Sequence, residues 1–261
     1  MLFSYHNHST YSDGNSNIDD IIKEAINLNL DEVGISDHFH IPKKNGYVFQ
    51  SDMEINKLDR YVKDVLKYKN LKKPKVKLGL EVEYVKETLE EFKAIIKKYP
   101  FDYLIASIHL VNKIIVVDEN SYKPKNFTTD IMIEYWIKIK ELAKSKAFDI
   151  IGHIDLYKKH GHKPQVELDN YIEDALNAIK DAGMSVEVNT SGFFFPCKEQ
   201  YPSIEILKKI KEKDISVLIN ADAHHPSNLI REFKKARQIL KKIGFEKLAK
   251  YNKRKKRLVS F

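Results

Sequence analysis

The sequence predicts an α/β protein whose parallel strands close into a barrel, and three observations support this prediction. Short apolar, β-branched runs alternate with segments of helical periodicity, which is typical of parallel strands joined by crossover helices. The runs show little alternation of polar and apolar residues, as expected of strands buried on both faces. Metal-binding residue types recur at their C-terminal ends, with matching pairs on the first and last runs. A closed barrel makes those two strands neighbours, so it explains the pattern better than an open sheet.

The predicted elements follow one another regularly along the chain. Predicted strands cover residues 2–8, 32–38, 76–84, 102–109, 148–155, 184–190 and 216–222. Helices are predicted between them, as in "IDDIIKEAINLNL" and "NYIEDALNAIKDAG". Ser51 and Glu54 have the spacing of a capping box, which predicts a helix start at Ser51. Gly183 is expected to end the helix that precedes the sixth strand.

Composition excludes several classes of protein and leaves the number of domains open. With 261 residues, 43% of them hydrophobic, the chain suits one large domain or two small ones. It has no apolar run of about 18 residues, and its N-terminus lacks a signal-peptide pattern. The single cysteine, Cys197, excludes an intramolecular disulfide and a thiolate-cage metal site. We therefore expect a cytoplasmic protein with no membrane association.

The formal charge of +8 and a basic C-terminal tail raise the question of nucleic-acid binding. Almost all the basic residues are lysines, and they are spread along predicted helices beside glutamates. This distribution favours a solvated surface, so we do not expect nucleic acid to be a partner. A positive field would also favour a substrate that carries a phosphate.

Alternating histidines in "YHNHSTYSDG" are the first sign of a metal site. His6 and His8 point to the same side of a strand because they are two residues apart, and Asp222 and His224 repeat that spacing. Imidazole and carboxylate ligands without thiolate suit zinc, iron or manganese. The candidate ligands are His6, His8, Asp13, His38, Glu81, His109, His153, Asp222 and His224. This set contains more ligands than one tetrahedral ion can bind and suffices for two or three divalent ions. Clustered ions of this kind suit the hydrolysis of phosphate esters.

Seven motifs in order resemble the polymerase-and-histidinol-phosphatase (PHP) superfamily. They are "HNHSTYSDG", "GISDH", "GLEVEY", "ASIHLV", "FDIIGHIDL", "VEVNTSG" and "NADAHHP". Within it the chain looks most like the monofunctional histidinol-phosphatases. The resemblance implies a single domain over 1–261, a distorted (β/α)7 TIM-like barrel with metal ions at the C-terminal rim, and a helical insertion around 41–75.

The resemblance also implies roles for individual residues. The first metal ion would be held by His6, His8, Glu81 and Asp222, and Glu81 would bridge to the second. His109 and His153 would complete the second site, and Asp13, His38 and His224 would hold the third. Ser36 and His40 lie where they could touch phosphate. His40 is the candidate acid for the leaving group, with a plain loop role as the alternative, and Asp13 also fits a turn residue before Gly14.

The chain departs from the family in the loops after the fifth and sixth strands. Relatives often place phosphate-binding arginines there, whereas this chain offers Lys158, Lys159 and Lys198. Lysine supplies charge but not a bidentate fork. Residues 193–195, three phenylalanines, are expected to pack against the substrate or to cover the barrel mouth. Glu83 or Asp155 are candidates to receive a substrate ammonium group.

Three functions are compatible with these patterns. The first is a metal-dependent phosphomonoesterase that hydrolyses L-histidinol phosphate, a small-molecule ester, in histidine biosynthesis. The second is a PHP enzyme acting on nucleotides, oligonucleotide ends or phosphotyrosine. The third is a non-catalytic protein that binds nucleic acid through its basic tail, which the full ligand set argues against. The sequence makes no prediction of oligomeric state.

Overall fold

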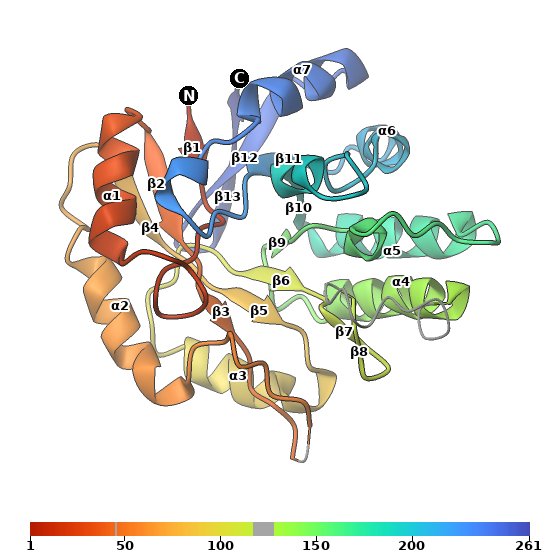
Figure 1. Ribbon diagram of the computed structural model, residues 1–261, viewed down its shortest axis with the longest axis horizontal. Coiled ribbons are helices and arrows are strands. Elements are labelled where there is room, and N and C mark those ends of the chain that lie inside the picture. The colour runs from red at the N-terminus through yellow and green to blue at the C-terminus, as the bar shows by residue number, and fades with distance from the viewer. Residues whose placement is uncertain (45, 117–127) are drawn as a thin grey trace.

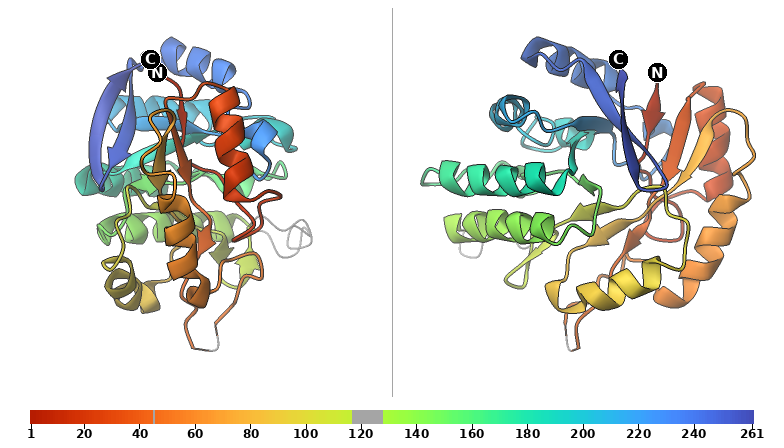
Figure 2. Two further views of the ribbon diagram at one scale, coloured as in Figure 1. Left: turned by 90° about the vertical axis from the view of Figure 1, so that its left-hand side faces the viewer. Right: turned by 180° about the vertical axis from the view of Figure 1, so that it is seen from behind.

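Parallel strands form the centre of the protein and α-helices surround them (Figure 1; Figure 2 adds two further views). The computed structural model describes residues 1–44, 46–116 and 128–261. The central strands are β1 (Phe3–Ser4), β2 (Glu32–Ile35), β3 (His38–Phe39), β4 (Lys75–Leu78), β5 (Glu81–Glu83), β6 (Ile105–Ser107), β9 (Ile150–Ile151), β10 (Ser185–Asn189) and β11 (Val217–Asn220). The α-helices are α1 (Ile18–Asn27), α2 (Leu58–Leu66), α3 (Leu89–Ile96), α4 (Thr129–Lys144), α5 (Asp169–Ala182), α6 (Ile204–Glu212) and α7 (Phe233–Ile243).

The parallel strands close into a distorted barrel. They form two sheets, with strand orders β1-β2-β4 and β11-β10-β9-β6-β5-β3. The second predicted strand divides into β2 and β3, and the third divides into β4 and β5, so each contributes to both sheets. Where they divide, the amide of Glu81 donates a hydrogen bond to the carbonyl of Asp37. The last strand returns to the first through a parallel bridge between Asn7 and Ala223. The predicted neighbourhood of the first and last strands is therefore confirmed.

Local sequence explains where the helices begin, end and pack. Asn17 caps α1 by accepting a hydrogen bond from the amide of Asp20, and the buried face of α1 is apolar. Gly183 follows α5 with a φ of 68°, a left-handed conformation that glycine adopts without strain, so this predicted helix end is confirmed.

The predicted helix start at Ser51 is wrong. A 3₁₀ turn, Ile55–Lys57, leads into α2, and no side chain in the described part of the chain caps either element. The carboxylate of Asp52 instead lies 2.6 Å from Nδ1 of His40, a tertiary contact that outweighs the local capping pattern. Within the predicted insertion around 41–75, the described residues form one α-helix, α2, which is the crossover to β4.

The basic C-terminal tail forms an antiparallel hairpin of β12 (Lys247–Asn252) and β13 (Lys255–Ser260). It packs against the starts of the central strands, opposite the ends that carry the predicted ligands. The hydroxyl of Tyr251 donates to the carbonyl of Asp149 just before β9, and Lys77 in β4 donates to the side chain of Asn252. A smaller hairpin, β7 (Leu110–Val111) with β8 (Ile114–Ile115), follows β6. Among the residues described, no helix has both the length and the apolar character needed to cross a membrane.

Candidate metal centre

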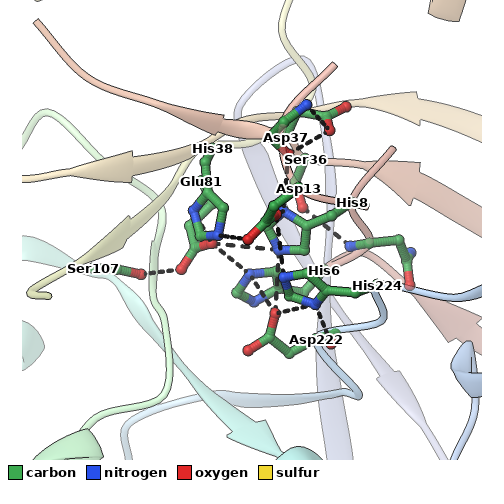
Figure 3. Close-up of polar contacts among 12 residues, drawn as sticks. His6, His8, Asp13, Ser36, Asp37, His38, Glu81, Ser107, Asp222 and His224 are labelled. Atoms are coloured by element: carbon green, nitrogen blue, oxygen red, sulfur yellow. Dashed lines mark hydrogen bonds and ion pairs between the residues drawn. The ribbon is translucent and has the colours of Figure 1, made fainter. Parts of the chain in front are cut away.

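The nine predicted ligands converge at the C-terminal ends of the central strands. Figure 3 labels all of them except His109 and His153. They form three groups, and within each group the ligand atoms lie within 4.8 Å of one another. The groups are His6, His8, Glu81 and Asp222; Glu81, His109 and His153; and His8, Asp13, His38 and His224. The sequence prediction placed the same residues together, except that His8 also joins the third group.

The chain places these groups next to one another through strand geometry. His6 and His8 point to the same side, and their Nε2 atoms lie 3.0 and 3.4 Å from Oε2 of Glu81. Asp222 follows the last strand, β11, and its Oδ1 lies 3.1 Å from Nε2 of His8. Asp222 has a φ of 54°, a left-handed conformation that is uncommon for a residue other than glycine and is concentrated at functional sites.

Glu81 lies between two of the groups, and its two oxygens face different partners. Oε2 faces His6, His8 and His38, the last with its Nδ1 at 2.9 Å. Oε1 faces His153, whose Nε2 lies 2.8 Å away, and accepts a hydrogen bond from Ser107 at 2.6 Å. A carboxylate with one oxygen toward each group has the geometry needed to bridge two ions.

Buried carboxylates orient two of the histidines from behind. Oε1 of Glu187 lies 2.7 Å from Nδ1 of His6, and Oε2 of Glu83 lies 3.0 Å from Nδ1 of His109. A carboxylate on one ring nitrogen directs the other toward a metal ion and raises its basicity. Glu83 is thereby engaged within the protein, which argues against its predicted contact with a substrate ammonium group.

Glu187 was missed by the sequence analysis. Its carboxylate also accepts hydrogen bonds from the amide of His153 and from the side chains of Asn189 and Asn220, at 2.8 to 2.9 Å. The available signal was a charged residue in the middle of an otherwise apolar strand, which is costly to bury unless it is paired.

Asp37 holds the loop that carries Asp13. The carboxylate accepts hydrogen bonds from the amide and hydroxyl of Ser9 and from the hydroxyl of Ser12, each at 2.7 Å. A Cβ at Gly14 would lie 2.2 Å from the carbonyl oxygen of His8, so this close turn requires glycine. The loop directs Asp13 into the ligand cluster, where its Oδ1 lies 3.2 Å from Nε2 of His224.

The cluster contains strongly perturbed ionisable groups. Burial opposes ionisation of Glu81, but the charges of His6 and His38 outweigh it and hold the pKa of Glu81 well below its usual value. Burial lowers the pKa of His38, yet Glu81 outweighs that effect and raises the pKa to about 10. Burial, with the charges of His224 and His38, lowers the pKa of His8 to about 3. In the metal-free protein at neutral pH, the His38 ring is therefore protonated and the His8 ring is neutral.

The donor set fits divalent transition metal ions. Nε2 of His6 and Oε2 of Glu81 are buried and have no hydrogen-bond partner within the described part of the chain, although they lie 3.0 Å apart. Buried polar atoms without partners are costly, and a shared cation would satisfy both. Imidazole and carboxylate together are ligands for zinc, iron and manganese.

A cavity of about 500 Å³ opens beside the cluster. Ligands such as His38, His109 and Asp222 line one part of it. Lys159, Arg231 and Asp52 line it as well, together with aromatic rings that include Phe49 and Phe195. The site therefore combines a metal-ligand wall with cationic and apolar walls, which suits an anionic ester that carries an organic group.

The structure brings one of the three predicted lysines to this cavity. Lys159 lines it, whereas Lys158 bonds to Asp155 and Glu199, each at 3.0 Å, and Lys198 is exposed outside it. These bonds also engage Asp155, the other predicted ammonium contact. Phosphate contact by Lys158 or Lys198 is therefore not supported.

The predicted phosphate contacts Ser36 and His40 are also absent from the cavity wall. Ser36 is fully buried and its hydroxyl accepts a hydrogen bond from the amide of Asn7 at 3.2 Å. His40 lies behind Asp52, with its Nδ1 2.6 Å from the carboxylate, and Asp52 is the group that reaches the cavity. The sequence analysis also missed Arg231, because it searched only the loops after the fifth and sixth strands for arginines.

Comparison with known proteins agrees with the geometry. Residues 4–191 match the PHP domain model. The chain is 28% identical to a probable histidinol-phosphatase of Clostridium acetobutylicum, covering 96% of this chain and 100% of that one, and 26% identical to a histidinol-phosphatase of Lactococcus lactis, covering 95% and 93%. It is similar in structure to histidinol phosphate phosphatase of Lactococcus lactis, complexed with zinc, L-histidinol and phosphate, with a TM-score of 0.79 at 23% identity over 98% of each chain. The chain belongs to the PHP domain family.

Proposed function

We propose that this protein is a metal-dependent phosphomonoesterase that hydrolyses L-histidinol phosphate to L-histidinol and phosphate. The observation that carries the reaction class is the position of Glu81 between adjacent ligand groups, beside a cavity that Lys159 and Arg231 line. The choice of ester is supported by similarity to histidinol-phosphatases along nearly the whole chain. Histidine biosynthesis in the cytoplasm is the corresponding setting, and a single free cysteine suits that compartment.

Two or three zinc, iron or manganese ions would occupy the three ligand groups. When bound, such ions lower the pKa of water and neutralise charge on phosphoryl oxygens. His6, His8 and Asp222 would hold one ion with Glu81, and His109 with His153 would hold a second across Glu81. Asp13, His38 and His224 would hold a third, next to His8.

The remaining residues would bind the ester and protonate its leaving group. Lys159 on the cavity wall would attract the phosphate dianion. His40 would supply a proton through Asp52, whose carboxylate is hydrogen-bonded to it and faces the cavity. A departing alkoxide needs such a proton because alcohols are weak acids. His40 would thus position Asp52 and return a proton to it, and would not touch the substrate.

A panel of phosphate esters tests the proposal. The holoenzyme should hydrolyse histidinol phosphate with a kcat/KM at least tenfold above that for nucleoside monophosphates, phosphotyrosine and 5′-phosphorylated oligonucleotides. A tenfold preference for any of those esters would overturn the substrate assignment and leave the phosphoesterase class intact. Salt-sensitive binding of duplex DNA without any hydrolysis would overturn both.

A further inference from the structure

Each of the three consecutive phenylalanines at 193–195, the last of which lines the cavity, has a cation over its ring. Nζ of Lys235 lies 3.7 Å from the ring centre of Phe193, and Nζ of Lys159 lies 4.1 Å from that of Phe195. Between them, Cζ of Arg231 lies 3.9 Å from the ring centre of Phe194. Cations at such distances are attracted to the face of an aromatic ring. The run therefore organises positive charge, a role that the sequence prediction did not include.

Two of these cations line the metal-site cavity, and neither forms an ion pair with another described residue. Arg231 and Lys159 both belong to the cavity wall. Among the described residues, the guanidinium of Arg231 makes no hydrogen bond or ion pair, and its Nε is buried without a partner. By contrast, Arg254 is paired with Asp149 and Arg60 lies 3.9 Å from Asp64. A partly buried guanidinium whose donors form no direct bond to a carboxylate is suited to receive an anion from solution.

The backbone holds Arg231 and Phe194 in this arrangement. The carbonyl oxygen of Arg231 accepts a hydrogen bond from the hydroxyl of Thr190 at 2.7 Å, which ties the loop after β11 to the end of β10. A Cβ at Gly192 would lie 2.1 Å from the carbonyl oxygen of Glu199, so only glycine allows the loop to fold back under the phenylalanines. The position of the guanidinium is therefore built into two loops rather than left to a mobile surface side chain.

We propose that Arg231 binds the phosphoryl group of the substrate and that Phe194 is its positioning residue. This inference rests on the proposed phosphatase function. The loops after β9 and β10 contain no arginine, so the loop after β11 supplies the bidentate fork that lysine lacks. Lys159, stacked on Phe195, adds a second positive charge to the same cavity.

The test uses the metal-loaded protein and inorganic phosphate as the probe. Arg231→Met should weaken phosphate binding by about 10- to 100-fold, the range for a lost charge-assisted hydrogen bond, and lower kcat/KM similarly. Arg231→Lys should recover part of the affinity, because it restores charge without the fork. Phe194→Leu should weaken phosphate binding about threefold to tenfold, since it removes the ring but keeps the loop apolar. Arg60→Met, at an exposed position on α2, is the matched control and should leave both quantities within twofold of the wild type.

Calorimetry with phosphate, product-inhibition kinetics and elemental analysis of bound metal provide the readouts. Phosphate affinity and kcat/KM within twofold of wild type for Arg231→Met, at unchanged metal content, would overturn the proposal. So would a fully restored affinity in Arg231→Lys, because a point charge would then suffice. Phosphate binding is measured without histidinol phosphate, so a wild type that prefers another ester would refute the substrate assignment alone.

Discussion

At the scale of single residues, the centre depends on Glu81, whose two oxygens face different ligand groups. An amide cannot neutralise two ions as a carboxylate does. Loss of a carboxylate that orients a ligand histidine from behind typically costs roughly 10- to 100-fold in activity. Glu81→Gln should reduce kcat by more than this, while the circular dichroism spectrum stays that of the wild type. Glu187→Gln, which alters the carboxylate behind His6, is the variant whose loss of kcat is compared with it. Similar losses in the two variants, or high residual activity in folded Glu81→Gln, would show that Glu81 does not bridge.

The pairing of Asp52 with His40 predicts a dependence on the leaving group. Asp52→Asn should lower kcat/KM for histidinol phosphate by about 100- to 10,000-fold, because its alkoxide must be protonated. p-Nitrophenyl phosphate releases a stable phenolate, so its kcat/KM should fall less than fivefold. Glu54→Gln, the same change at an exposed carboxylate two residues away, should change neither value. Equal losses on both esters would refute proton transfer through Asp52.

At the scale of elements, periodicity predicted where the strands lie but not where they break. The run 32–38 was predicted as one strand, yet it divides into β2 and β3. The break falls at Ser36 and Asp37, whose side chains bind the chain around Asn7 and Ser9. Such tertiary contacts have no local signature. The charge of Glu187 within an apolar strand was visible in the sequence, but its partners were not. The nine ligands were predictable because strand ends in a parallel barrel meet at one rim.

The C-terminal hairpin was not predicted because its turn lacks the usual residues. Lys253 and Arg254 both have positive φ values, 49° and 63°, where hairpins of this kind favour asparagine and glycine. Contacts with the barrel compensate: the amide of Lys253 donates to the carboxylate of Asp102 at 3.0 Å, and Arg254 pairs with Asp149. The turn is therefore stabilised by tertiary bonds and not by local preference.

This account predicts that Arg254 stabilises the fold. Arg254→Leu leaves the carboxylate of Asp149, which is mostly buried, without its cation, and should lower the free energy of unfolding by about 1–3 kcal/mol. Lys255→Ala, the next residue and an exposed one, should change it by less than about 0.5 kcal/mol. Urea unfolding of the metal-loaded proteins measures both. Equal, small effects would mean that the ion pair does not fasten the hairpin to the barrel.

At the scale of the whole molecule, the cations of the C-terminal tail and the cluster of carboxylates and imidazoles lie at opposite ends of the barrel strands. Several cations of the basic tail are engaged in contacts with the rest of the protein. Lys250 pairs with Glu32, and Lys256 donates to the carbonyl of Gly183 at 2.8 Å. At the other end of the strands, carboxylates and imidazoles compete for protons. The net charge of +8 therefore does not by itself indicate a nucleic-acid surface.

The competition for protons predicts how metal binding depends on pH. In the metal-free protein the pKa of His38 is raised to about 10, above its usual 6.5, so the ring is protonated at pH 7 and its ion pairs persist until the pH rises through 10. A metal ion binds only neutral imidazole, so uptake must release that proton, and affinity should rise from pH 6 to pH 9. Calorimetric titration of zinc into chelator-treated protein, in buffers of different ionisation enthalpy, measures this release and should find more than one ion per chain. His38→Ala should release fewer protons, whereas His225→Ala, an exposed neighbour of the cluster, should behave as the wild type. One ion or fewer per chain, or an affinity independent of pH, would contradict a proton-coupled cluster.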